Sequence, residues 1–82
     1  MNIKGKNFDG RHPSTIHLLQ YFKCAHLPAG PLRDVSSQLG ELGCDMVAQL
    51  PDGPELTAGL RKLLEAKDCF VRAALDIPKD ES

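Results

Sequence analysis

The fold is decided by residues 52–78, which read DGPELTAGLRKLLEAKDCFVRAALDIP. Seam positions recur there at alternating intervals of four and three: Leu56, Leu60, Leu63, Lys67, Phe70, Ala74 and Ile77. This spacing places them on one face of an α-helix. A second stripe of Leu64, Val71 and Leu75 widens that face. Asp52 and Glu55 have the spacing of a capping box at the start of the helix, and Pro78 ends it.

A second long helix is predicted just before this one, from Pro31 to about Leu50. Its apolar residues again alternate spacings of three and four: Leu32, Val35, Leu39, Leu42 and Met46. Such an a/d heptad seam is typical of helices packed side by side. The break between the helices is short, at residues 51–54. We therefore predict an antiparallel helical hairpin over residues 31–77.

The N-terminal part is predicted to be simpler. Residues 1–12 contain two glycines and no helical period, so we expect an extended arm. Pro13 then opens a short helix that runs to Phe22, and residues 27–31, which include two prolines, end it. The predicted fold class is all-α, with an arm (1–12), one three-helix domain (13–78) and a polar tail (79–82).

Gly40 and Gly43 lie in the interior of the second helix, where each costs about 1 kcal/mol relative to Ala. With Ser36 and Val47 they make a smooth strip beside the leucine seam. We interpret the strip as a site of close helix packing or a kink. The alternative is a gap that lets a ligand or another protomer reach the backbone.

Several charges on the third helix also need an explanation. Lys67 occupies a seam position, and we expect it to extend to the edge of the seam while Asp68 pairs with Arg72. The alternatives are a ligand role or a role in fixing the register between subunits. Arg61 has Glu65 four residues on, which indicates a solvated pair, with a pocket role as the alternative.

The apolar surface of the third helix exceeds what one short helix can cover. The remainder would be exposed on a monomer, and large exposed apolar patches mark interaction sites. A chain of 82 residues also has a thin core, and such chains often gain stability by self-association. We therefore predict an oligomeric helical bundle.

Composition narrows the functional class. Cys24, Cys44 and Cys69 are odd in number and widely spaced, which indicates a reduced cytoplasmic protein rather than a disulfide framework. The first fifteen residues lack an apolar run, so we expect no signal peptide, and no stretch approaches the roughly 20 residues of a membrane span. A net charge of −1 argues against DNA coating. We expect neither a DNA nor a membrane partner.

Catalysis and metal binding are not favoured either. The sequence lacks a strand-to-helix elbow, a Gly-rich phosphate loop and a carboxylate pair. The histidines and nearby cysteine, His12, His17, Cys24 and His26, do not follow the i, i+3 or i+4 spacing of helical metal ligands. We expect no enzymatic activity, no metal and no other cofactor.

Residues 7–13, which read NFDGRHP, have the most chemical character. Phe8 offers a stacking ring, Arg11 a fork of donors and His12 an imidazole, just ahead of a helix N-terminus, where free N–H groups bind anions. The alternative is structural: Phe8 packs as a hydrophobic staple, and Asp9 or His12 caps the helix. The sequence leaves both interpretations open.

Residues 50–57 (LPDGPELT) and 60–68 (LRKLLEAKD), with 7–15 (NFDGRHPST) and 26–28 (HLP), resemble a hairpin domain of small phage and prophage proteins. That group includes the phage anti-CBASS and anti-Thoeris proteins. The resemblance covers most of the chain. It implies a hexameric sponge in the cytoplasm of an infected bacterium. Such a protein sequesters cyclic nucleotide immune signals, either cyclic di- or oligonucleotides or the cyclic ADP-ribose type, without cleaving them.

The resemblance also implies where a ligand would bind. Family pockets lie between protomers, near the short first helix and the hairpin, where rings stack on bases and cationic side chains reach phosphates. By matching location and type, the implied ligand-binding residues are Phe8, Arg11, His12, Arg33 and Arg72. Residues 69–72 (CFVR) lack the large aromatic residue of the family pattern, and the Gly40–Gly43 pair also departs from it.

Two other functions are weighed against the sponge. The first is a helical adaptor or inhibitor that presents the hairpin to a host protein. The second is a small hydrolase that acts on the same nucleotides.

Overall fold

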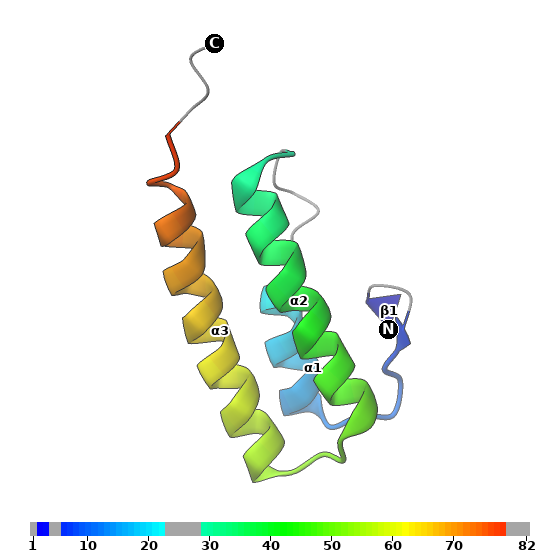
Figure 1. The fold of residues 1–82 in the computed structure, drawn as a ribbon. Helices are drawn as coiled ribbons and strands as arrows, with labels where there is room; N and C mark the ends of the chain where they lie inside the picture. Colours follow the sequence, from blue (N-terminus) through cyan, green and yellow to red (C-terminus); the bar gives the residue numbers. More distant parts are fainter. Residues whose placement is uncertain (1, 4–5, 23–28, 79–82) are drawn as a thin grey trace.

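The computed structural model describes residues 2–3, 6–22 and 29–78. Its elements are β1 (Asn2–Ile3), β2 (Lys6–Asn7), α1 (Pro13–Leu19), the 3-10 turn η1 (Gln20–Phe22), α2 (Pro31–Gln49) and α3 (Pro54–Ala74). The predicted all-α class is confirmed, with a short N-terminal helix followed by two long packed helices (Figure 1). The strands pair antiparallel within the predicted arm, with Asn2 opposite Asn7.

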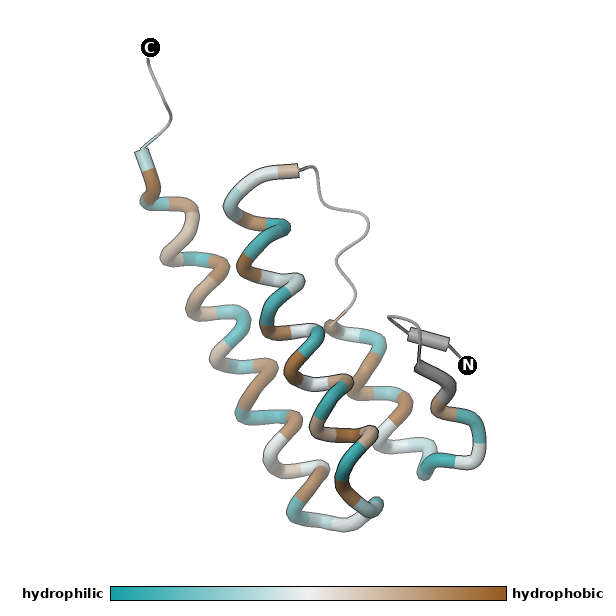
Figure 2. Tube along the Cα trace, turned by 45° about the vertical axis from the view of Figure 1, so that its right-hand side comes forward, coloured by the Kyte–Doolittle hydropathy of each residue, from teal (hydrophilic) through white to brown (hydrophobic). Residues whose placement is uncertain are grey.

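The two long helices lie side by side and antiparallel, and α1 packs across one face of the pair (Figure 1). Hydrophobic positions recur along each helix at helical spacing (Figure 2). The buried apolar cluster draws on the arm, α1, η1 and both long helices: Phe8, Leu18, Leu19, Phe22, Cys44, Val47, Leu56 and Leu60, with Leu63 and Leu64 packed against it. One thin core therefore joins the end of the arm to α1, η1 and both long helices.

The three α-helices begin in the same way, with a proline at the first helical position of each. His12 caps α1 through its side chain, which accepts from the backbone N–H of Ser14. The capping box predicted at α3 is wrong: Gly53 is the N-cap, and no side chain caps it. The reason is that Asp52 is engaged by α1 and the arm, as described below. α3 ends at Ala74, and a turn continues to Ile77.

The buried face of α2 is the small-residue strip. Its buried residues are Ser36, Gly40, Gly43, Cys44 and Val47. The leucine seam flanks this face, and Leu42 is 45% exposed. The expectation that the seam forms the main packing surface is therefore wrong, whereas Gly40 and Gly43 do lie on the buried, packed face of α2. The cause is the third element, because a Cβ added to Gly43 would lie 3.5 Å from Phe22 Cε1.

The charged seam residue Lys67 reaches across to η1. Its Nζ donates a hydrogen bond of 2.9 Å to the carbonyl oxygen of Tyr21. A cation at the C-terminal end of a helical segment satisfies a free carbonyl there. The predicted pair between Asp68 and Arg72 is not formed in the described part of the chain. Arg72 donates instead to the Cys69 sulfur, at 3.4 Å.

Candidate ligand pocket between two helix N-termini

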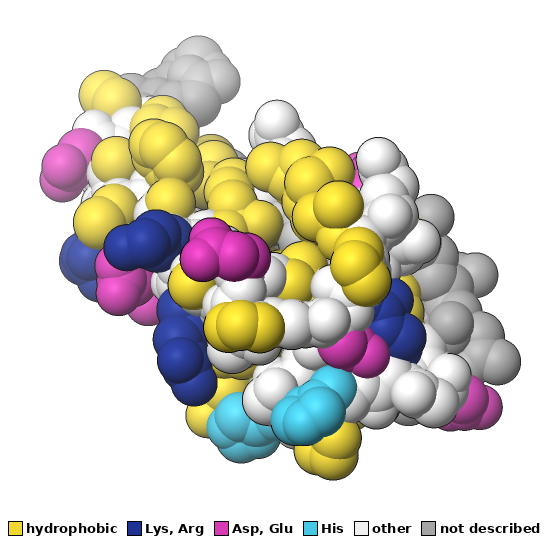
Figure 3. Space-filling view, turned by 90° about the horizontal axis from the view of Figure 1, so that it is seen from below, with side chains coloured by type: hydrophobic (Ala, Val, Ile, Leu, Met, Phe, Trp, Pro, Cys, Tyr) yellow, Lys and Arg dark blue, Asp and Glu magenta, His cyan; other side chains and the backbone are white. Residues whose placement is uncertain are grey.

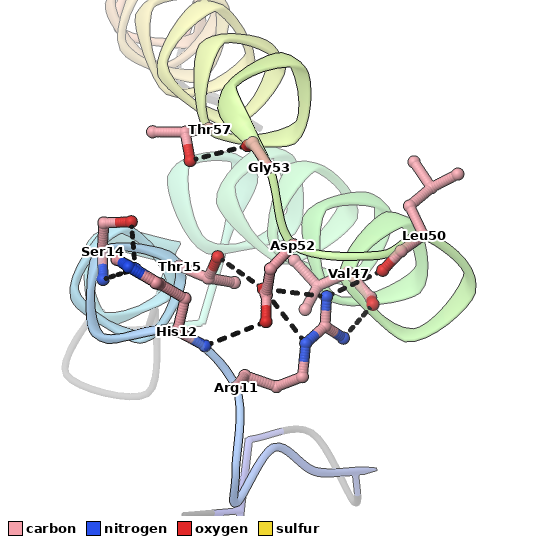
Figure 4. A network of polar contacts seen from close by, with 9 residues as sticks. All are labelled: Arg11, His12, Ser14, Thr15, Val47, Leu50, Asp52, Gly53 and Thr57. Carbon is pink, nitrogen blue, oxygen red and sulfur yellow. Dashed lines mark hydrogen bonds and ion pairs between the residues drawn. The ribbon is translucent and has the colours of Figure 1, made fainter.

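Asp52, in the turn between α2 and α3, gathers three groups from the N-terminal part of the chain (Figure 4). Its carboxylate accepts from Arg11 Nε at 3.1 Å, from the backbone N–H of His12 at 3.0 Å and from the Thr15 hydroxyl at 2.9 Å. Thr15 is fully buried. We call this group, with Asp52 at its centre, the Asp52 clip. It fixes the start of α1 against the turn of the hairpin.

Arg11 also caps the C-terminal end of α2. Its guanidinium donates to the carbonyl oxygens of Val47 and Leu50, the latter at 2.7 Å. The last carbonyls of a helix lack partners within the helix, and a cationic donor satisfies them and favours the negative end of the helix dipole. The Arg11 hydrogen bond is also the main reason that the pKa of Asp52 falls from 3.8 to about 2, with smaller contributions from His12 and Thr15.

An open pocket of about 410 Å³ lies beside the clip. It is lined by α1 and its cap, by the turn and by the first two turns of α3: His12, Ser14, Thr15, Gly53, Pro54, Thr57, Ala58 and Arg61. Sites for small molecules commonly measure about 300–1,000 Å³. The histidines lie at this end of the molecule, with basic side chains nearby (Figure 3).

Two cationic or titratable groups in this pocket are available to a ligand. The Nδ1 atom of His12 is used by the cap, since it accepts from the Ser14 N–H at 3.1 Å. Within the described residues, its other ring nitrogen has no hydrogen-bond partner, and Arg61 has neither a hydrogen bond nor the expected ion pair with Glu65. The hydroxyls of Thr15 and Thr57 already donate within the chain, to Asp52 and to the Gly53 carbonyl oxygen. A guanidinium and an imidazole on one pocket are nevertheless suited to a phosphate or another anion.

The residues assigned through the family resemblance divide into two groups. Phe8 is 3% exposed and packs in the core, as the staple interpretation expects. Arg11 is engaged in the clip, and only His12 lines the pocket. Arg33 and Arg72 lie at the opposite end of the hairpin (Figure 1), because α2 begins where α3 ends. The nineteen residues of α2 separate these ends by about 28 Å.

The five residues therefore do not form one site within a single copy. Their binding roles stay predictions, since no ligand tests them. His26, Cys24 and the HLP segment at 26–28, which also entered the sequence interpretation, lie outside the described residues.

Arg61 lines the pocket, where the sequence favoured a solvated pair with Glu65, and Asp52 holds the clip, where the sequence predicted a helix cap. A signal for Arg61 exists, because Pro54, Thr57, Ala58 and Arg61 follow the i, i+3, i+4, i+7 pattern of one helix face. No comparable signal exists for Asp52, whose partners lie about forty residues earlier in the chain. Local capping was the only role that its neighbours could indicate.

Fold and site together define a small all-helical protein with an open polar pocket at one end. None of its helices, over the described residues, combines the length and apolar character needed to cross a bilayer. The same residues contain no cluster of three or more His, Cys, Asp or Glu placed to hold a metal. Comparison with models of protein families, with curated proteins and with solved structures finds no match to this chain.

Proposed function

We propose that this protein binds and sequesters a cyclic nucleotide signal of bacterial immunity without cleaving it. The observation that supports this best is the open pocket between α1 and α3, whose lining includes Arg61 and His12, each with a donor that no other described residue uses. Cyclic nucleotides and cyclic ADP-ribose isomers carry phosphates, which guanidinium groups bind through paired hydrogen bonds. The chemistry of the pocket thus suits the ligand class that the sequence resemblance implies.

Binding without turnover is favoured by how the pocket is built. Its titratable base, His12, already uses Nδ1 as a helix cap. The nearby carboxylate, Asp52, is held by Arg11, His12 and Thr15 and does not line the pocket. The pocket therefore presents donors to an anion but offers no paired acid and base. As part of the same proposal, the protein acts as a phage counter-defence factor in the cytoplasm of the infected host, as a homo-oligomer of the hexameric type.

The test is a depletion and recovery experiment. The protein is incubated with a panel of cyclic di- and trinucleotides and cyclic ADP-ribose isomers, and the free ligand is measured by chromatography before and after heat denaturation. Loss of one signal followed by its intact release supports sequestration. A cleaved product would indicate a hydrolase, and no depletion of any compound would contradict the proposal.

Variants locate the site. Arg61→Gln removes the free guanidinium, and His12→Asn keeps a good N-cap while removing the free ring nitrogen. Each is expected to weaken binding by about tenfold or more, the scale of one lost charge-assisted hydrogen bond. Arg33→Gln and Arg72→Gln, at the other end of the hairpin, serve as matched controls. If these two weaken binding and the pocket variants do not, the ligand lies at the far end instead.

A second candidate function is a helical adaptor or inhibitor of a host protein. The observation in its favour is the apolar groove between α2 and α3, beside which Leu42 and Leu50 are each 45% exposed. It predicts that no nucleotide is depleted in the experiment above. The two candidates are thus separated by one measurement.

A further inference from the structure

The face of the hairpin opposite α1 carries an apolar groove of about 280 Å³. Its lining comes from α2, from the start of α3 and from the residue after α2: Leu42, Met46, Leu50, Glu55, Leu56, Gly59, Leu60 and Leu63. Hydrophobic side chains gather over this face, away from the histidines (Figure 3). Glu55 is the one charged residue in the lining. We call this surface the α2–α3 groove.

Gly59 leaves the middle of the groove open. It lies within α3, where glycine costs about 1 kcal/mol relative to alanine, and a Cβ added there would meet nothing within 4 Å. No contact within the described chain therefore requires a glycine at this position. A glycine on an exposed helix face lets a second helix approach closely.

Two opposite charges flank Gly59 at nearly equal distances along the helix. Glu55 lies four residues before it and Lys62 three residues after it, on the same side of α3. Both are exposed, and neither has a hydrogen bond or ion pair among the described residues. An antiparallel copy of α3 that crosses near Gly59 brings each Glu55 opposite the Lys62 of the other copy.

We propose that the α2–α3 groove is the contact surface for a second copy of this chain, related by a two-fold axis near Gly59. A two-fold interface uses the same patch on both subunits and must be self-complementary. The groove meets this condition, with Leu42 and Leu50 supplying apolar area and two Glu55–Lys62 pairs supplying register and orientation. A different protein partner would not require the charges to mirror each other about Gly59.

Charge reversal tests the register. Sedimentation velocity over a concentration series is expected to show a monomer–dimer equilibrium, or larger assemblies built on this dimer. Glu55→Lys and Lys62→Glu are each expected to raise the dissociation constant by about tenfold, because two pairs become repulsive. The double variant restores the pairs and the wild-type constant. Glu65→Lys, an exposed reversal on the same helix but outside the groove, is the matched control.

Cross-linking tests the centre of the contact. In a Cys24→Ser, Cys69→Ser background, Gly59→Cys is expected to form a disulfide dimer under mild oxidation, since the two residues 59 are closest at the axis. Wild-type Cys69, which is exposed on the same helix, gives the comparison. The proposal is overturned if the chain stays monomeric at 100 times the working concentration, or if the double variant does not restore the wild-type dissociation constant. Efficient cross-linking through Cys69 alone would also overturn it.

Discussion

Asp52 shows how one carboxylate can hold distant segments together. It joins the arm and α1 to the hairpin turn, and Arg11 keeps its pKa at about 2 rather than 3.8. A carboxyl with a lowered pKa contributes stability above its ordinary pKa, and this contribution is lost as the pH falls toward the lowered value. The clip therefore makes the protein less stable between about pH 4 and pH 2 than it is at neutral pH.

The corresponding prediction concerns Asp52→Asn. This variant is expected to melt at a lower temperature at pH 6 and to lose less of its remaining stability between pH 4 and pH 2 than the wild type. Thermal unfolding followed by circular dichroism across this range measures both effects. Asp68→Asn, an exposed carboxylate on α3, is the control and should keep the wild-type slope. An unchanged acid slope in Asp52→Asn would show that the clip does not carry the pH dependence.

Gly43 offers a second prediction at the scale of a residue. An added Cβ would meet Phe22 at 3.5 Å and Leu63 at 3.6 Å, which are ordinary van der Waals distances. Gly43→Ala therefore fits the site and gains helix propensity, for a stabilisation of about 0.5–1 kcal/mol. Gly43→Leu would overpack the site and is expected to cost about 1–3 kcal/mol. Urea unfolding of both variants checks the pair, and a destabilised Gly43→Ala would refute the tolerance inferred here.

Among the secondary-structure elements, α2 differs most from the prediction, because it buries its small-residue strip rather than its leucine seam. The seam has the better heptad pattern, yet Cys44 and Val47 on the small-residue strip are fully buried. Phe22 of η1 lies against the strip at Gly43, and Leu19 of α1 is fully buried in the same cluster. The heptad pattern describes contacts between two helices only, and for two helices it predicts that the leucine seam is the buried face. A third helix that packs on the same pair selects the face where small residues admit it.

Two valines of α2 test this choice of face. Val47 lies on the strip and is fully buried, whereas Val35 lies on the seam and is half-buried. Val47→Ala is expected to cost about 2 kcal/mol through lost burial and a small cavity, and Val35→Ala about 1 kcal/mol or less. Because both changes are the same substitution in the same helix, propensity cancels. Equal costs in chemical denaturation would mean that the seam shares the core equally.

For the molecule as a whole, sequence periodicity predicts the hairpin but not the contacts that attach α1 and the arm to it. The helical spacing around Leu60 and Leu39 and the proline at 31 mark both long helices correctly, because these signals are local. The Asp52 clip could not be predicted from the sequence, nor could the fact that His12 and Arg61 line the same pocket. They depend on how α1 is placed against the turn, which no local pattern encodes.

The arm closes this fold through two contacts that we expect to act together. Phe8 is buried in the core, and Arg11 holds Asp52 and the end of α2. Removal of either side chain loosens the same segment. The second removal should therefore lower the free energy of unfolding by less than the same substitution does in the wild-type chain. Phe8→Ala is expected to cost about 3 kcal/mol or more. The Phe8→Ala, Arg11→Ala double variant should fall short of the sum of the single costs by about 1 kcal/mol.

Urea unfolding of the four proteins in this cycle measures the coupling. The matched cycle uses Arg33→Ala, a basic residue at the far end of the hairpin, with Phe8→Ala. It should be additive, because Arg33 shares no contact with the arm among the described residues. Additive costs in the Arg11 cycle as well would mean that the arm is held by two independent contacts. A positive coupling confined to Arg11 makes the arm, the clip and the end of α2 one cooperative unit, and it places the pocket wall formed by His12 within that unit.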